Sequence, residues 1–207
     1  LKGRILVAKI GINGTVAGRY EDVQKYLDLM NADSRFADMD YKEGYGDEST
    51  FKKMFVRVKD ELVTLRVPLD MENRGEHITP EKFNEMIEND PDVVLVDMRN
   101  FYEYELGRFK NAIPMKMDSF RELPEAVKAI ESYKDKKILT YCTGGVRCEP
   151  ASAFLKQQGF KKVYQLEGGI IRYSEQFPDK HFEGSCFVFD GRMAVPVNKT
   201  KNLVISE

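Results

Sequence analysis

Residues 137–155, KILTYCTGGVRCEPASAFL, join an apolar run to a glycine-containing turn and a second segment rich in apolar residues. The run 137–141 predicts a strand that ends just before Cys142. Pro150 suits the first turn of a helix, where its missing N–H costs nothing, and Gly159 is a natural C-terminal stop. The stretch therefore predicts a strand, a tight loop and a helix whose N-terminus points at the loop.

Cys142 lies where a thiol should be acidic. Backbone N–H groups of the loop, the positive end of the helix dipole and the charge of Arg147 all favour a thiolate. The alternative is an inert cysteine buried at a strand end, but such a cysteine does not need two glycines that let the backbone wrap around an anion. We therefore predict that Cys142 is a reactive thiolate at neutral pH, in an active-site loop made of Thr143, Gly144, Gly145, Val146 and Arg147.

The length of this loop narrows the chemistry. Four residues lie between Cys142 and Arg147. Cysteine phosphatases use a loop that is one residue longer to enclose a tetrahedral phosphate. The shorter loop fits a single terminal sulfur atom better than it fits a phosphate group.

The loop resembles the active-site loop of rhodanese domains, in which the cysteine carries a persulfide. Residues 97–114 resemble the rhodanese pattern Asp-x-Arg, Glu and Gly-His-Ile-x-Gly-Ala, with Arg108 and Asn111 where His and Gly are usual. More specifically, the whole chain is similar to the tRNA uridine hydroxylase family, bacterial proteins with a rhodanese domain behind a small N-terminal domain. The segments that carry this similarity are residues 11–18, 142–149 and 187–192.

The resemblance implies an oxygen-dependent hydroxylase that converts the wobble uridine of tRNA to 5-hydroxyuridine. Cys142 would be its essential residue, tRNA its partner and molecular oxygen its co-substrate, with no metal or organic cofactor evident. The loop alone suggests a second function, a sulfurtransferase that passes persulfide sulfur to cyanide, a thiol or a protein. A non-catalytic binding module is disfavoured because Cys142 and Arg147 are both present.

Composition sets further bounds on the function. The chain has 207 residues, of which 42% are hydrophobic and 11% aromatic, enough to build real cores. A net charge of -2 gives no global attraction to nucleic acid, so RNA binding needs a local basic patch.

Three cysteines without paired spacing favour a reducing compartment, and we expect the cytoplasm. No stretch approaches the roughly 20 apolar residues of a membrane span, and no signal-peptide pattern is present. The oligomeric state is left open.

Three segments are expected. Residues 1–72 predict a small α+β domain of ferredoxin-like type, with strands at 4–10, 38–42, 54–58 and 62–67 and a helix at 20–30. Residues 73–180 predict a rhodanese-like parallel sheet with helices on both faces, reached through a polar linker at 73–76. Its strands are expected at 93–97, 138–141 and 162–166. Thr79 is the expected N-cap of a helix that ends at 87, and further helices are expected at 120–133 and 170–177. Residues 181–207 form a C-terminal extension. It is expected to be truncated, because the hydroxylase family continues into a cysteine-rich tail.

The glycines of residues 11–18 lie between a predicted strand and a predicted helix, where a phosphate could be bound. They lack both the Gly-x-Gly-x-x-Gly spacing and a Gly-Lys-Ser/Thr ending, so we predict a structural turn.

A basic cluster in the N-terminal segment is the candidate RNA-binding surface. Its members are Lys52, Lys53, Arg57 and Lys59. Phe51 and Phe55 lie between them, and aromatic rings can stack on bases while the cations bind phosphates. The alternative is a solvated strand face without a partner.

The sequence allows two interpretations for several residues near the site. Asp97, Arg99 and Glu103 are either a catalytic acid/base set or, as we favour, a charge network that supports the loop. Cys148 is either a resolving thiol or a small residue that closes the loop. His77 and His181 have no cysteine or carboxylate at ligand spacing, so no metal site is predicted.

Overall fold

The chain divides into two compact units. The structure, a computed structural model, describes residues 1–37, 39, 41–44, 46–47, 50–178 and 180–197. The N-terminal unit comprises residues 1–62 together with 189–193, and the C-terminal unit comprises residues 63–188 and the segment from 194. The division after residue 62 differs from the predicted boundary at 72, because Leu65 is buried in the hydrophobic core of the C-terminal unit.

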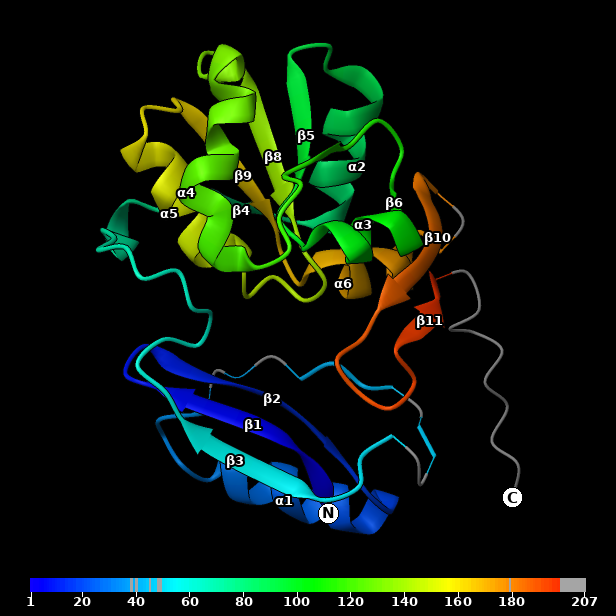
Figure 1. The fold of residues 1–207 in the computed structure, drawn as a ribbon. Helices are drawn as coiled ribbons and strands as arrows, with labels where there is room; N and C mark the ends of the chain where they lie inside the picture. Colours follow the sequence, from blue (N-terminus) through cyan, green and yellow to red (C-terminus); the bar gives the residue numbers. More distant parts are fainter. Residues whose placement is uncertain (38, 40, 45, 48–49, 179, 198–207) are drawn as a thin grey trace. The chain divides into compact units, whose positions relative to one another are not determined.

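The N-terminal unit is a three-stranded sheet with one helix, the α+β arrangement predicted from the sequence. It contains β1 (Lys2–Ala8), β2 (Gly11–Ala17), α1 (Tyr20–Asn31) and β3 (Met54–Val58). The strand order is β2-β1-β3, with β2 antiparallel and β3 parallel to β1. Figure 1 shows this sheet with α1 against one of its faces.

Two local predictions for this unit are wrong. Residues 11–17 are a strand rather than a turn, since they pair along their whole length with β1. A Cβ at Gly14 would lie 2.6 Å from the carbonyl oxygen of Arg4, so the glycine permits close strand approach. Residues 62–67 are not a strand. Of the weak strand predicted at 38–42, residues 38 and 40 lie outside the described residues, and 39, 41 and 42 are not in a strand.

The C-terminal unit is built on the predicted parallel sheet. Its five strands, in spatial order, are β4 (Glu76–Ile78), β9 (Lys162–Leu166), β8 (Lys137–Tyr141), β5 (Val93–Asp97) and β7 (Ile113–Pro114). Every neighbouring pair is parallel. The two edge strands β4 and β7 are short and were not predicted, and Glu76 begins β4 instead of belonging to a linker.

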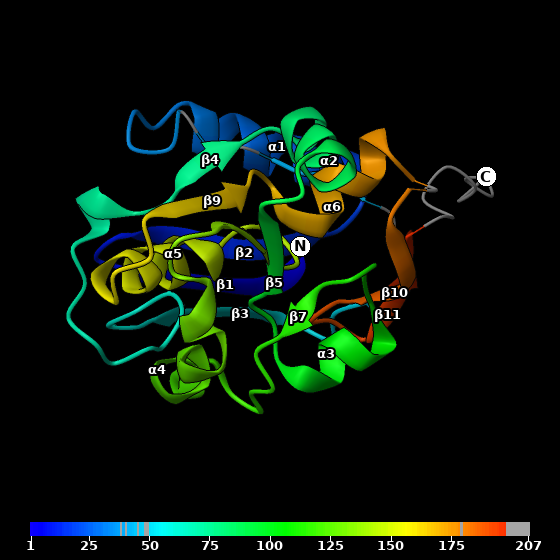
Figure 2. The ribbon, with the colours of Figure 1, turned by 90° about the horizontal axis from the view of Figure 1, so that it is seen from above.

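Helices cover both faces of this sheet, as predicted. Figures 1 and 2 show α2 (Pro80–Asn89) and α6 (Gly169–Gln176) on one side, with α4 (Leu123–Ala126) and α5 (Cys148–Gln157) on the other. Alternate side chains of β8 enter two separate cores, because Ile138 packs with the α5 face while Leu139 packs with the α6 face. The helix predicted at 120–133 is instead α4 flanked by 3-10 turns at Phe120–Glu122 and Val127–Tyr133.

A second, antiparallel sheet lies beside α3 (Phe101–Leu106) in the same unit. Its strands are β6 (Gly107–Phe109), β10 (Phe182–Phe187) and β11 (Ala194–Pro196), in the order β11-β10-β6. Residues 182–187 are thus part of the C-terminal unit rather than of a separate extension. Within the described residues, no helix combines the length and apolarity that crossing a membrane requires.

Candidate active site

The predicted strand–loop–helix around Cys142 is confirmed. Strand β8 ends at Tyr141, Cys142 follows directly, and α5 begins at Cys148. Helix α5 ends at Gln157, and Gly159 has the positive φ of 89° that favours glycine after a helix. The loop therefore lies at the carboxyl edge of the parallel sheet, with the N-terminus of a helix directed at it.

The sulfur of Cys142 is buried, with 1% of the residue exposed, and is surrounded by donors. The Gly145 amide donates to Sγ at 3.2 Å. Burial by itself would raise the pKa of Cys142, but the hydrogen bond from the Cys148 thiol, the charge of Arg147 and the amides of Cys148 and Arg147 lower it to about 6. The direction of this shift is the one expected from the sequence, and the reactivity of Cys142 stays a prediction.

Arg147 is clamped by a buried carboxylate. Its NH1 and NH2 atoms donate to the Glu103 carboxylate oxygens at 2.5 and 2.8 Å, and NH2 also donates to the hydroxyl of Thr143 at 3.1 Å. Glu103 is fully buried and also accepts from the Asn100 amide at the start of α3, at 3.2 Å. The loop is thus bound to α3, and the guanidinium whose charge acts on Cys142 is held in place by Glu103.

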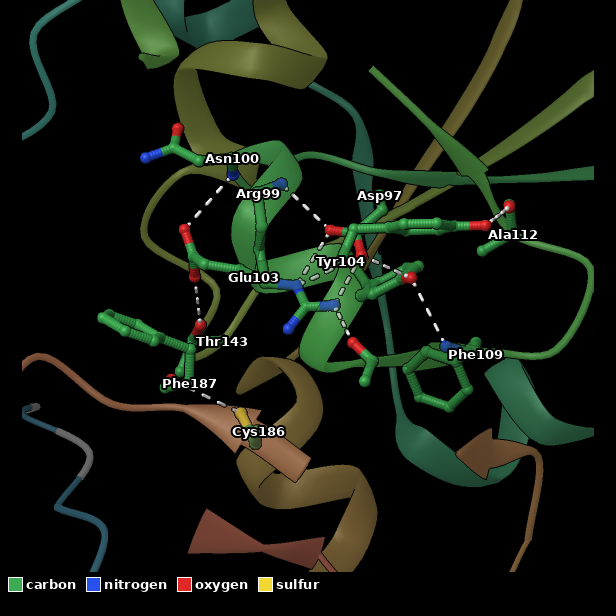
Figure 3. A network of polar contacts seen from close by, with 12 residues as sticks. Asp97, Arg99, Asn100, Glu103, Tyr104, Phe109, Ala112, Thr143, Cys186 and Phe187 are labelled. Atoms are coloured by element: carbon green, nitrogen blue, oxygen red, sulfur yellow. Dashed lines mark hydrogen bonds and ion pairs between the residues drawn. The ribbon is translucent and has the colours of Figure 1, made fainter. Parts of the chain in front are cut away.

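Asp97 and Arg99 form a second ion pair, separate from Glu103. Arg99 Nε and NH2 donate to the two Asp97 oxygens at 2.9 and 2.6 Å, and the Tyr141 hydroxyl donates to Asp97 at 2.7 Å. Arg99 NH2 also donates to the Gly107 carbonyl at 2.6 Å. Figure 3 shows this pair and the separate contacts of Glu103 with Asn100 and Thr143. The Asp97 carboxylate already accepts hydrogen bonds from Arg99 and Tyr141. This favours a role in a supporting charge network over a role as a catalytic acid or base.

A glycine turn before α6 also supports the loop, a role that was not predicted from the sequence. The Ile170 and Ile171 amides donate to the carbonyls of Cys142 and Thr143 at 3.0 and 3.1 Å. Gly169 has a φ of 64°, and a Cβ there would lie 2.5 Å from the Cys142 carbonyl oxygen. The available signal was the Gly168-Gly169 pair that opens a helix after a buried strand.

The other two cysteines have raised pKa values. Burial raises the pKa of Cys148 well above its usual value, and the hydrogen bond with the Cys142 sulfur adds to this. Burial also raises the pKa of Cys186, on β10, to about 11. All three cysteines are free thiols.

The basic cluster lies in the N-terminal unit, on and beside β3. Its four side chains are exposed, as RNA binding would require. Lys53 and Arg57 flank the Phe55 ring, at 5.5 and 4.5 Å from its centroid. Phe55 and Phe51 are both half-buried. The cations and the ring of Phe55 thus lie together, although part of each ring is covered.

Among the described residues, no group of three His, Cys, Asp or Glu side chains is placed to hold a metal ion. The two histidines lie in separate pairs, His77 with Glu149 at 2.5 Å and His181 with Glu88 at 2.9 Å.

Comparison with known proteins gives the family. Residues 79–176 match the model of the rhodanese-like domain, and residues 1–62 match that of the UPF0176 acylphosphatase like domain. The chain is 46% identical, over its whole length, to proteins named tRNA uridine(34) hydroxylase from Cytophaga hutchinsonii and Bacillus velezensis. This chain belongs to the tRNA uridine(34) hydroxylase family. It spans 66% of the length of these two members of the family.

The two domain models confirm both parts of the predicted fold, a rhodanese-like sheet and a small N-terminal α+β domain, the latter of acylphosphatase-like type. Among solved structures, the rhodanese-like domain of an Anabaena sp. protein is 18% identical, with a TM-score of 0.45, and covers 63% of this chain and 86% of its own.

The two departures of this family member from the usual rhodanese pattern have local explanations. Asn111 has a φ of 64°, a conformation in which asparagine is the best substitute for glycine. Arg108 places its guanidinium 4.9 Å from the ring centroid of Tyr104, on the preceding helix α3.

Proposed function

We propose that this chain carries the catalytic centre of a tRNA hydroxylase that forms 5-hydroxyuridine at the wobble position. The observation that supports this most is Cys142, whose sulfur accepts from the Gly145 amide and whose pKa is lowered to about 6, in a chain 46% identical along its length to proteins named tRNA uridine(34) hydroxylase. Molecular oxygen is the proposed co-substrate and Cys142 the essential residue.

The surrounding residues have supporting roles in this proposal. Thr143, Gly144, Gly145 and Val146 shape the loop, and Arg147 adds a positive charge that Glu103 fixes in position. Asp97 and Arg99 hold the end of β5 against Tyr141 and β6. Each of these groups acts through the position or the charge of the Cys142 sulfur.

Transfer RNA is the proposed partner, and we place the activity in the cytoplasm, where tRNA resides. A chain with a net charge of -2 needs a local cationic surface to bind RNA. The exposed basic cluster around Phe55 supplies one, so we assign tRNA backbone binding to it.

A persulfide sulfurtransferase is the second candidate. It is favoured by the short loop between Cys142 and Arg147 and by the match of residues 79–176 to the rhodanese-like domain. In that reaction Cys142 would accept sulfane sulfur from a donor and pass it to a nucleophile.

Nucleoside analysis of tRNA separates these functions. In cells that lack the gene, the full-length protein should restore 5-hydroxyuridine at the wobble position, whereas Cys142→Ser should not, because a hydroxyl remains protonated where the thiol ionises. Cys186→Ser is the matched control and should restore the nucleoside. Restoration by Cys142→Ser would remove Cys142 from the reaction. Unchanged nucleosides in the deletion strain, with efficient thiosulfate sulfurtransfer by the purified protein, would favour the sulfurtransferase.

A further inference from the structure

Two buried thiols lie at the ends of the active-site loop. Cys142 follows β8, and Cys148 is the first residue of α5. Gly145 lies between them and contacts both, because its amide donates to the Cys142 sulfur at 3.2 Å and its carbonyl accepts from the Cys148 amide at 3.0 Å. Both cysteines belong to the hydrophobic core on the α5 face of the sheet. We propose that Cys142 and Cys148 are a redox couple, in which a hydroperoxide oxidises Cys142 and Cys148 captures the oxidised sulfur as an intramolecular disulfide.

The contacts of the two sulfurs give them different roles. Cys142 receives the amides of the loop and the charge of Arg147, so it is the thiolate and the nucleophile toward peroxide. Cys148 is also fully buried, and because burial raises its pKa it remains a protonated thiol. An acidic thiolate beside a neutral thiol is the arrangement in which one sulfur is oxidised first and the other resolves it.

The chemistry balances without any further reactant. The Cys142 thiolate attacks one oxygen of hydrogen peroxide, so an S–O bond forms, the O–O bond breaks and hydroxide leaves. Two electrons pass from sulfur to peroxide, and Cys142 becomes a sulfenic acid. The Cys148 sulfur then attacks the Cys142 sulfur, forming the S–S bond and breaking the S–O bond. The hydroxyl leaves as water with the proton of Cys148.

The backbone between the two cysteines can accommodate the closure. Gly144 has open space where a Cβ would be, and Gly145 has a φ of 96°, so this part of the loop can adjust at low cost. Cys142 is anchored by the Ile170 amide on its carbonyl. Because Gly145 already contacts both the Cys142 sulfur and the Cys148 amide, we expect disulfide formation to move the Cys148 side of the loop rather than Cys142.

The third cysteine packs in a different hydrophobic core from the couple. Cys186 lies in the hydrophobic core on the α6 face, whereas Cys142 and Cys148 lie in the core on the other face. Cys186 is therefore a buried thiol of the same protein that should not join the disulfide, and it serves as the internal control.

Formation of the disulfide would reversibly inactivate the proposed active site, because it removes the Cys142 thiolate. It would also protect Cys142 from further oxidation to sulfinic acid. It does not depend on which reaction Cys142 catalyses. Disulfide formation is read directly on the protein, so its failure and the failure of the hydroxylase proposal are distinguishable.

Peptide mapping tests the couple. Trypsin cleaves after Lys137, Arg147 and Lys156, which places the two cysteines in separate peptides, 138–147 and 148–156. The folded chain is treated with hydrogen peroxide, blocked with an alkylating reagent and digested without reductant. We expect the two peptides to appear linked, and dithiothreitol to separate them. Cys186→Ser should give the same linked peptides, whereas Cys148→Ser should give Cys142 sulfinic acid instead.

The proposal is wrong if the parent protein loses its Cys142 thiol without the linked peptides while sulfinic acid accumulates as fast as in Cys148→Ser. A link between Cys142 and Cys186 would also overturn it. If Cys148→Ser fails to fold, Cys148→Ala replaces it, and the mapping of the parent protein decides the question without either variant.

Discussion

At the scale of single residues, three buried cysteines acquire different acidities from the groups around each sulfur. Desolvation penalises the thiolate at all three positions. Only at Cys142 do the hydrogen bonds and the positive charge of Arg147 outweigh it.

The first prediction concerns the rate at which Cys142 reacts with iodoacetamide. Because its pKa is lowered to about 6, the rate should fall as pH drops through that value, where the thiolate becomes protonated, and should level off above it. Labelling of peptide 138–147 across a pH series measures this. Cys148 and Cys186 should label far more slowly at neutral pH. Equal rates for the three cysteines in the folded chain would remove the basis for choosing Cys142.

The second prediction concerns the clamp on Arg147. In Glu103→Gln the side chain keeps its size but loses its charge, so a guanidinium with only 9% of its residue exposed loses the carboxylate that binds it through two hydrogen bonds. Loss of one partner of such a buried pair costs about 3–5 kcal/mol. Denaturant unfolding measures the free energy. Glu105→Gln, an exposed position on the same helix, is the control and should change stability by no more than about 0.5 kcal/mol. Equal, small effects would mean that the clamp is not structural.

At the scale of elements, the active-site loop depends on two helix N-termini. Helix α5 directs its first amides at the Cys142 sulfur, while the first turn of α6 donates to the carbonyls of Cys142 and Thr143. One terminus therefore stabilises the charge on the side chain, and the other fixes the backbone that carries it. Gly169 makes the second contact possible because its backbone lies where any Cβ would collide with the loop.

The third prediction compares two glycines. Both Gly169→Ala and Gly159→Ala place a non-glycine residue at a positive φ, which costs about 1–2 kcal/mol. Only at Gly169 would the new methyl group collide with the loop, because the space around Gly159 is open. Gly169→Ala should therefore displace the Cys142 carbonyl and slow alkylation of Cys142 at neutral pH. Gly159→Ala should lower the melting temperature while leaving the alkylation rate unchanged. If both variants alkylate like the parent, the glycine turn does not position the loop.

At the scale of the whole molecule, the two units have different parts in the proposed function and differ in how much hydrophobic core they contain. The C-terminal unit has two extended cores and holds the thiol chemistry. The N-terminal unit exposes the basic cluster, and its helix α1 has no fully buried residue. A sulfurtransferase would need only the first of these, whereas a tRNA enzyme also needs a surface that attracts a polyanion.

The fourth prediction uses this division. Lys52→Glu combined with Lys59→Glu should weaken tRNA binding and reduce its salt dependence, because fewer counterions are released on association. Filter binding over a series of salt concentrations measures both. Lys128→Glu combined with Lys161→Glu, on exposed positions of the C-terminal unit, makes the same change in net charge and should leave binding near that of the parent. Thiosulfate sulfurtransfer should be equal in all three proteins. If the first variant binds tRNA with unchanged affinity and salt slope, the basic cluster is not the RNA surface.

Local sequence determined the elements whose signals lie within a few residues. Thr79 accepts from the Lys82 amide as the predicted cap of α2, and β3, β5 and β9 have the predicted bounds. The position and acidity of Cys142 also followed from neighbouring residues, because strand end, loop glycines and helix start are consecutive in the chain.

Tertiary structure alone decided the contacts between distant segments. Residues 11–17 became a strand because β1 lies beside them, and residues 62–67 did not because no strand pairs with them among the described residues. The ion pair between Glu103 and Arg147 likewise joins positions far apart in sequence. The packing of Cys186 in a different core from the other two cysteines also depends on distant segments. Local propensity and periodicity report only on neighbours along the chain, whereas these contacts depend on which elements pack side by side.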